Sequence, residues 1–124
     1  MKNRILVVLS ESFKRELKPL AKKFPSLSQE LRELSRQLNE NPQLGTTIGK
    51  NCYKIRLAVR SKGGGKNGGM RVITYVVVRL RLGDDGVTTV YLASIYDKSE
   101  RENITDAQLK AVIAALNTLP DPNP

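Results

Sequence analysis

The sequence predicts an α+β fold in which helices pack on one face of an antiparallel sheet. Apolar residues recur every three or four positions within residues 13–38 and 109–116, which is the spacing of amphipathic helices. Within residues 52–96 they instead alternate with polar residues or form short dense runs, as strands do. The chain has 124 residues, which fits one domain, and we expect the tail from about residue 120 onward to be frayed.

The N-terminal part of the sequence predicts a strand followed by a helix. Residues 4–9 predict a strand, because the apolar run at 5–9 is too short for a signal peptide and charged residues follow it at once. Ser10 or Ser12 can cap a helix whose apolar residues continue to Phe24. Pro19 lies inside this helix and predicts a kink or a break, because proline has no N–H to donate.

A second helix completes a helical hairpin joined at Phe24-Pro25. Ser26 and Gln29 have the spacing of a capping box, in which each side chain satisfies a free backbone N–H. A leucine stripe at residues 27, 31, 34 and 38 follows, and Asn41-Pro42 ends the helix.

From Cys52 the apolar period changes to two, which predicts a strand with one buried face and one open face. The apolar face carries Tyr53, Ile55, Leu57 and Val59, and the open face carries Lys54, Arg56, Ala58 and Arg60. A glycine-rich loop at residues 61–69 leads to a strand at 70–82, whose dense apolar middle indicates a central position. A turn at 84–86 leads to a strand at 87–96, and Thr105 with Gln108 predicts a capped last helix.

The net charge of +9 is concentrated in the middle of the chain. Between Glu40 and Asp84 there is no acidic residue, whereas the same stretch holds nine cations. The rest of the chain holds twelve positive and twelve negative residues. A concentrated positive field favours polyanions through attraction and counterion release, so nucleic acid is the expected partner.

The composition also excludes several classes of protein. The chain has no histidine, which removes the usual general base, most zinc sites and the common nucleophilic triads, and we expect no metal or cofactor. Its single cysteine, Cys52, cannot form an internal disulfide and is expected to be a small core residue. No apolar stretch is long enough for a membrane span, so we expect a cytoplasmic protein.

The basic open face of the sheet is the strongest candidate site, with Lys54, Arg56, Arg60 and then Arg71. Strand geometry separates alternate residues by roughly 6–7 Å, which is the scale of consecutive phosphates. Arginine can stabilise charge on a phosphate in the transition state, and a lysine can take over proton transfer where histidine is absent.

Two further features supplement this face. The glycine-rich loop carries Lys62 and Lys66 and can clamp a polyanion, although it lacks the Gly-Lys-Ser/Thr ending of a nucleotide-binding loop and a strand follows it. Tyr96 ends its strand beside Lys98, where it can stack on a base or share in proton transfer, although a core role is the common one for a tyrosine.

The sequence resembles the RelE/ParE superfamily of type II toxins, and its HigB-like branch in particular. The resemblance is carried by Ser10–Lys14, Asn41-Pro42, Leu44-Gly45, Cys52–Leu57, Lys62–Gly69 with Arg71–Tyr75, and Tyr91–Glu100. It covers the chain from Ile5 to about Leu116. It implies a microbial ribonuclease-type fold and a ribosome-dependent endoribonuclease that cleaves mRNA by attack of the 2′-OH on the adjacent phosphate.

The resemblance also assigns roles to individual residues. Lys54, Arg56 and Arg71 match basic positions that the ribonuclease members use, and Lys98 lies where such members place a further basic residue. Some members carry an arginine after that lysine, where this chain has Ser99, and a tyrosine near the position of Ile104. On this assignment Tyr96 takes the place of the missing tyrosine, and Arg60, Lys62 and Lys66 bind RNA.

The resemblance leaves three functions open. The first is an mRNA interferase whose partners are ribosome-bound mRNA and a cognate antitoxin, with no membrane and no small-molecule substrate. The second is a superfamily toxin that acts on a protein such as DNA gyrase. The third is a basic nucleic-acid-binding module without catalysis.

Overall fold

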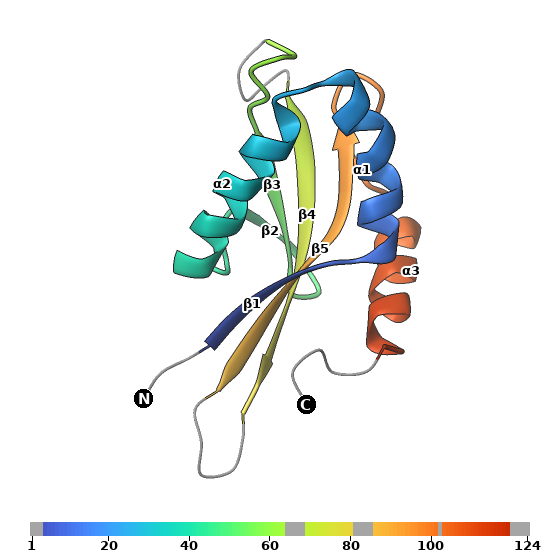
Figure 1. Cartoon of the computed structure of the whole chain (residues 1–124). Helices are drawn as coiled ribbons and strands as arrows, with labels where there is room; N and C mark the ends of the chain where they lie inside the picture. Colours follow the sequence, from blue (N-terminus) through green and yellow to red (C-terminus); the bar gives the residue numbers. More distant parts are fainter. Residues whose placement is uncertain (1–3, 64–68, 81–85, 102, 120–124) are drawn as a thin grey trace.

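The computed structural model describes residues 4–63, 69–80, 86–101 and 103–119, which form a five-stranded sheet and three helices (Figure 1). The elements are, in chain order, β1 (Arg4–Leu9), α1 (Glu11–Lys23), α2 (Leu27–Glu40), β2 (Thr46–Gly49), β3 (Cys52–Leu57), β4 (Met70–Arg79), β5 (Val87–Asp97) and α3 (Asp106–Asn117). The strands lie in the order β1-β5-β4-β3-β2. The α+β class predicted from the sequence is therefore confirmed.

The sheet is mixed, so the prediction of an antiparallel sheet is wrong for one of its edges. β1 runs parallel to β5, with Arg4 opposite Val87 and Leu9 opposite Leu92, while the other strand pairs are antiparallel. A parallel pair needs a long connection between its strands. The two helices and three strands that lie between β1 and β5 in the chain provide that connection.

β2 is a short strand that the sequence analysis did not predict. It pairs with β3 through a tight hairpin in which Gly49 lies opposite Cys52. The two residues between them, Lys50 and Asn51, have positive φ angles of 56° and 62°, as a two-residue hairpin turn requires. Their sequence is Lys-Asn rather than the usual Asn-Gly, so the turn signal was weak.

The helices cover both faces of the sheet, which corrects the expectation that they share one face. α1 and α2 pack on a core that includes Phe13, Leu34 and Val72. α3 packs on a second core with Ile73 and Tyr91, which alternate with the first set along their strands. Every residue of β5 is buried, as expected for a strand covered on both sides.

Two of the three predicted helix caps are confirmed. The hydroxyl of Ser10 accepts from the N–H of Phe13, and Thr105 forms the predicted capping box with Gln108. Ser26 makes no cap, because its hydroxyl is bonded to Glu30 at 2.9 Å and to Ser61 at 2.8 Å.

α1 continues through Pro19 without a break. Pro19 is on the exposed side of the helix, where water can bond the carbonyl that the missing N–H leaves free.

Several expectations fall outside the described residues. These are most of the glycine-rich loop, with Lys66, the greater part of the turn at 84–86, and the tail from residue 120. Within the described part of the chain, no helix combines the length and apolar character needed to cross a membrane.

Candidate functional site

The strand register aligns Arg56, Arg71 and Tyr96 in one row across the sheet. Arg71 is the partner of Arg56 on β3 and of Tyr96 on β5. Neighbouring strands lie about 4.8 Å apart, so the three α-carbons span roughly 10 Å. Arg56 and Arg71 alternate along their strands with residues of the core beneath α1 and α2, and Tyr96 belongs to the core beneath α3. The row therefore lies on the α3 face. Lys54 lies two residues before Arg56 on the same face.

Burial divides this row into an exposed and a buried part. Arg56 is exposed and makes no hydrogen bond or ion pair within the described residues. Arg71 is only 4% exposed, and its Nη1 donates to the carbonyl of Met70 at 3.3 Å. The expectation that Arg71 stands on an open face is therefore wrong, because the central strand that carries it is covered on both sides.

Lys54 is half-buried and held in place by a residue that the sequence analysis missed. Its Nζ donates to Oδ1 of Asn103 at 3.2 Å. Asn103 belongs to the segment between β5 and α3, which has no apolar periodicity and therefore gave no signal. The contact joins β3 to the N-terminal end of α3.

Tyr96 is 3% exposed, and a second residue missed from the sequence packs on its ring. The guanidinium of Arg101 lies 4.8 Å from the ring centroid, a cation–π distance, and donates to Glu16 of α1 at 3.3 Å. Ser94 bonds the same carboxylate at 3.0 Å. This network fixes the position of Arg101 on Tyr96.

Burial raises the pKa of Tyr96 above its ordinary value, opposed in part by the backbone of Ile104 and the charges of Arg101 and Arg71. The phenol is therefore protonated at neutral pH and can donate a hydrogen bond. The Ile104 amide acts on the phenol oxygen, but the hydroxyl has no hydrogen bond of normal geometry within the described residues. Tyr96 and Ile104 line the same small cavity.

Arg60 does not belong to this row. Its backbone N–H donates to Glu30 at 2.7 Å, and its side chain reaches Glu30 at 3.5 Å and Gln29 at 3.2 Å. β3 ends at Leu57, so the alternation that predicted Arg60 on the open face stops before it. Arg60 instead ties the chain to α2.

Lys62 is anchored rather than free. Its Nζ lies 3.4 Å from Oδ1 of Asp97, whose side chain is only 2% exposed. Burial alone would raise the pKa of Asp97, but hydrogen bonds from Ser99 and the charge of Lys62 outweigh it, and the pKa lies below its ordinary value. The lysine predicted to bind RNA therefore closes the base of the glycine-rich loop.

Lys98 is exposed just beyond β5. Its backbone N–H donates to the carbonyl of Gly69 at 3.3 Å, so it lies beside the other end of that loop. Its side chain makes no hydrogen bond or ion pair within the part of the chain described here. Lys98, like Arg56, is therefore an exposed cation of this region to which a ligand has access.

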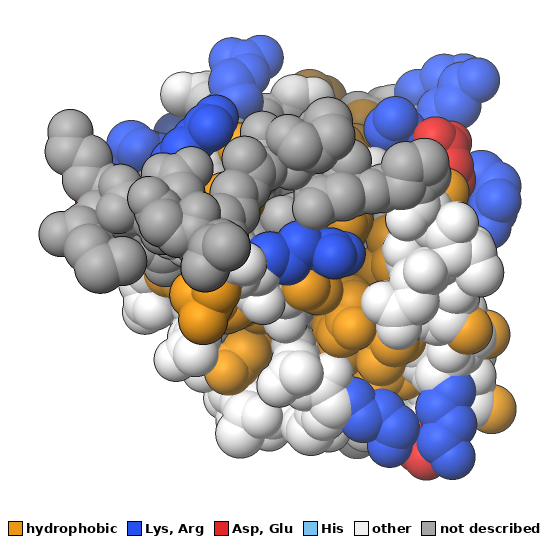
Figure 2. Space-filling view, turned by 90° about the horizontal axis from the view of Figure 1, so that it is seen from below, with side chains coloured by type: hydrophobic (Ala, Val, Ile, Leu, Met, Phe, Trp, Pro, Cys, Tyr) orange, Lys and Arg blue, Asp and Glu red, His pale blue; other side chains and the backbone are white. Residues whose placement is uncertain are grey.

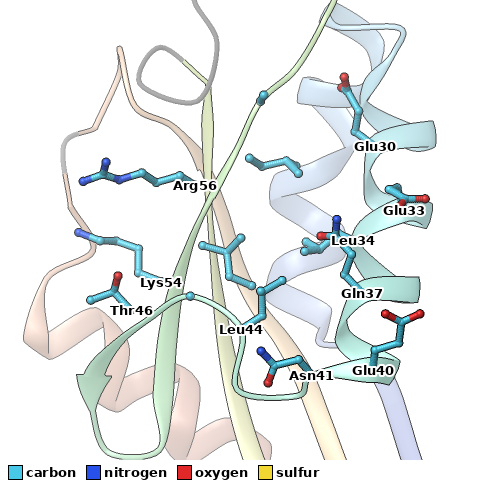
Figure 3. A pocket seen from close by; sticks show the side chains of 14 residues that line it. Glu30, Glu33, Leu34, Gln37, Glu40, Asn41, Leu44, Thr46, Lys54 and Arg56 are labelled. Carbon is cyan, nitrogen blue, oxygen red and sulfur yellow. The ribbon is translucent and has the colours of Figure 1, made fainter.

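A larger groove of about 940 Å³ lies between α2 and β3 (Figure 3). Apolar side chains that include Leu34 and Leu44 point into it, while Lys54 and Arg56 point to the other side of β3 (Figure 3). Its α2 wall carries Glu30, Glu33 and Glu40, and Arg36 pairs with the last two. Glu30 lies 3.5 Å from Arg60, so the carboxylates of this wall are paired with arginines, and Lys54 and Arg56 line the groove from β3.

The end of the molecule away from the row carries a different mixture of side chains from the row and the groove. Seen from below, it shows apolar side chains in the middle and separate lysines and arginines around them (Figure 2). The exposed apolar residues of the described chain include Val78 and Leu80 at the far end of β4.

Cys52 is buried and burial raises the pKa of its thiol to about 11, so it is the core residue that the sequence predicted. A comparison of the chain with protein-family models finds no match.

Proposed function

We propose that this protein is a metal-independent endoribonuclease of the toxin type, acting on mRNA at the ribosome. The observation that carries the proposal is the alignment of Arg56 with Arg71 on the α3 face, next to Lys54, in a chain without histidine. Two arginines at paired register positions, one of them exposed, suit a phosphate whose negative charge grows during reaction.

In the proposed reaction the 2′-oxygen of a ribose attacks the adjacent phosphorus and the bond to the 5′-oxygen breaks. The products are a 2′,3′-cyclic phosphate and a free 5′-OH end. The proton lost by the 2′-hydroxyl and the proton gained by the leaving oxygen must pass through side chains or water. We assign this exchange to Lys54, which lies two residues from Arg56 on the same face and whose Nζ donates to Asn103.

The other cations have supporting roles in this proposal. Arg56 contacts the phosphate, and Arg71 adds positive charge beneath it. Lys98 draws the RNA strand toward the row, since it is exposed and lies beside the glycine-rich loop. The excess positive charge of the chain supports the same partner.

The resemblance to RelE/ParE toxins adds two partners to the proposal, the ribosome and an antitoxin. An antitoxin that neutralises the enzyme would cover the α3 face near Arg56 with acidic groups, which gives electrostatic complementarity.

A non-catalytic RNA-binding module is the second candidate, and the burial of Arg71 and Tyr96 favours it. Only Arg56 of the three aligned residues is exposed, so the row offers less direct contact than an open face would.

Induction in a bacterium separates the two candidates. An active enzyme should arrest growth and create new mRNA 5′-OH ends within translated regions, and the ends should disappear when ribosomes are kept off the message. Arg56→Ala should abolish both effects at equal expression. Normal growth at high expression with no new 5′ ends would contradict the enzyme and leave the binding module.

A further inference from the structure

One edge of β3 is open where β2 ends. β2 pairs with β3 only as far as Thr46, which lies opposite Lys54. The chain before Thr46 does not continue the pairing, because the N–H of Leu44 donates to the carbonyl of Asn41 at 3.2 Å. Among the described residues, no strand therefore lies beside Arg56 on this side of β3.

The backbone of Arg56 faces this open edge. In an antiparallel pair, successive residues direct their N–H and C=O groups to opposite sides of the strand. The carbonyl of Asn51 accepts from the N–H of Val76 on β4 at 2.9 Å. The same alternation directs Ile55 and Leu57 toward β4 and directs Arg56 away from it. The N–H and C=O of Arg56 are therefore left without a strand partner, and an added extended chain can satisfy both.

The open edge borders the groove between α2 and β3. The groove has a volume of about 940 Å³, within the range of about 300–1,000 Å³ for pockets that hold ligands. Lys54 and Arg56 line it although their side chains point to the other side of β3, so they face it with their backbone (Figure 3). Its apolar lining includes Leu34, Leu44 and Leu57. An extended peptide fits both features, because its backbone can pair with β3 while alternate side chains pack on the leucines.

The charges on the two sides of this edge determine what the peptide must carry. On the groove side, the three glutamates of α2 are paired with arginines, so the groove favours uncharged side chains. On the other side, Lys54 donates to Asn103, whereas Arg56 is exposed and makes no ion pair within the described residues. Residues directly opposite each other in an antiparallel pair share a face, so a carboxylate opposite Arg56 forms a cross-strand ion pair.

We propose that this edge binds an extended segment of a partner protein, in which apolar residues flank an acidic residue placed opposite Arg56. The segment adds a strand to β3 and fills the groove with its apolar side chains. A second copy of this chain fits less well, because it brings its own Arg56 and a net charge of +9 to the same edge.

Occupation of this edge also has a consequence for the row. A carboxylate bound to Arg56 keeps a phosphate away from the same guanidinium, so the segment inhibits the reaction proposed above. The binding of the segment does not depend on that reaction, and only its inhibitory effect rests on the proposed function.

Titration of the full chain with a short capped peptide, in which valines flank a central glutamate, tests the proposal. At saturation the N–H of Arg56 should become protected from hydrogen exchange, whereas those of Ile55 and Leu57, which already face β4, should change little. N-methylation of the glutamate removes the donor to the Arg56 carbonyl and should weaken binding by about tenfold. The same peptide with glutamine in place of glutamate should bind about threefold more weakly.

Two variants make the charge contact specific. Arg56→Gln should remove the difference in affinity between the glutamate and glutamine peptides and keep the backbone protection at position 56. Lys98→Gln is the matched control, since Lys98 is an exposed cation that does not line the groove, and the difference should persist.

Three results would overturn the proposal. The first is a lack of protection at the Arg56 N–H in the presence of excess peptide. The second is equal affinity for the N-methylated and the unmodified peptide. The third is protection at the Arg56 N–H that rises with protein concentration in the absence of peptide, which would assign the edge to a second copy of the chain.

The test also separates this inference from the proposed function. Protection of Arg56 by the peptide without cleavage of any mRNA refutes the enzyme and supports the docking site. Cleavage of mRNA without protection by the peptide supports the enzyme and refutes the docking site. Where both are observed, saturating peptide should abolish cleavage, and unchanged cleavage would refute the contact between the peptide and Arg56.

Discussion

Arg71 illustrates how far a single residue can be placed from sequence. Alternation along its strand put it on the same face as Arg56, and the register confirms that the two are partners. Alternation says nothing about what covers that face, and Arg71 is in fact buried. Arg101 and Asn103 could not be found at all, because they act from an irregular segment where only the folded chain shows the contacts.

Replacement of Arg71 should affect folding as well as activity. Arg71→Ala leaves a void under the sheet face and removes a donor from the Met70 carbonyl. We expect a loss of about 1–3 kcal/mol in the free energy of unfolding, measured by urea denaturation. Arg56→Ala, at an exposed position, should change stability by less than about 0.5 kcal/mol. Equal stability of the two variants would contradict the burial of Arg71.

Gly45 is a second residue whose identity is fixed by the fold. Its φ angle is +103°, and an added Cβ would lie 2.6 Å from the carbonyl oxygen of Lys54 and 2.8 Å from the side chain of Ile55. Backbone cannot move aside cheaply, so Gly45→Ala should cost about 1–3 kcal/mol in the free energy of unfolding. Gly49→Ala is the control for the backbone angle, because Gly49 also has a positive φ, of 87°, but has open space around it. If the close contacts at Gly45 matter, Gly45→Ala must lower the free energy of unfolding clearly more than Gly49→Ala does.

Among the elements, those with strong apolar periodicity were predicted well. The two helices of the hairpin and the last helix follow from their leucine and valine stripes, and β3 follows from its alternation. β2 was missed because four residues carry too little pattern. The parallel pairing of β1 and the place of α3 on the second face were not predictable from pattern alone. Both depend on which surfaces remain uncovered when the chain folds, as the doubly buried β5 shows.

The base of the glycine-rich loop is an element whose stability should depend on pH. The pKa of Asp97 is lower in the folded protein than in the unfolded chain, where it is about 4. The ionised carboxylate therefore adds to the free energy of unfolding at pH values above about 4, and this contribution is lost as the pH falls through the folded-state pKa. Asp97→Asn should reduce stability at neutral pH and weaken the loss of stability on acidification. Urea denaturation at a series of pH values between about 2 and 7 measures both effects.

Glu100→Gln is the control for Asp97→Asn. Glu100 is an exposed carboxylate 4.0 Å from Lys23, and exposed pairs contribute little. Its replacement should leave the pH profile close to that of the wild type. The same acid dependence in wild type and Asp97→Asn would contradict the lowered pKa of Asp97 and the stabilisation by Ser99 and Lys62 on which it rests.

At the scale of the whole molecule, charge and cavities separate into distinct regions. The row with Arg56, Lys54 and the small cavity lies on the α3 face, whereas the large groove, with its paired glutamates on α2, lies between α2 and β3. Uniform charge would make the protein a general polyanion binder. Under the proposed function, this separation would give an RNA strand one preferred face, as a site-directed cleavage reaction needs.

The central claim is that the row containing Arg56 catalyses a reaction at a phosphate and does not merely attract it. The most direct test uses purified ribosomes programmed with a defined mRNA. The single-turnover cleavage rate is measured at saturating protein, and the affinity of the protein for the programmed ribosome is measured separately. Arg56→Ala should lower the rate by about 10² or more while affinity falls by less than about tenfold, because the other cations still supply non-specific binding. Arg36→Ala removes an equal charge from the α2 side and should change neither quantity. The account is contradicted if the wild-type protein does not cleave, or if Arg56→Ala loses rate and affinity in the same proportion.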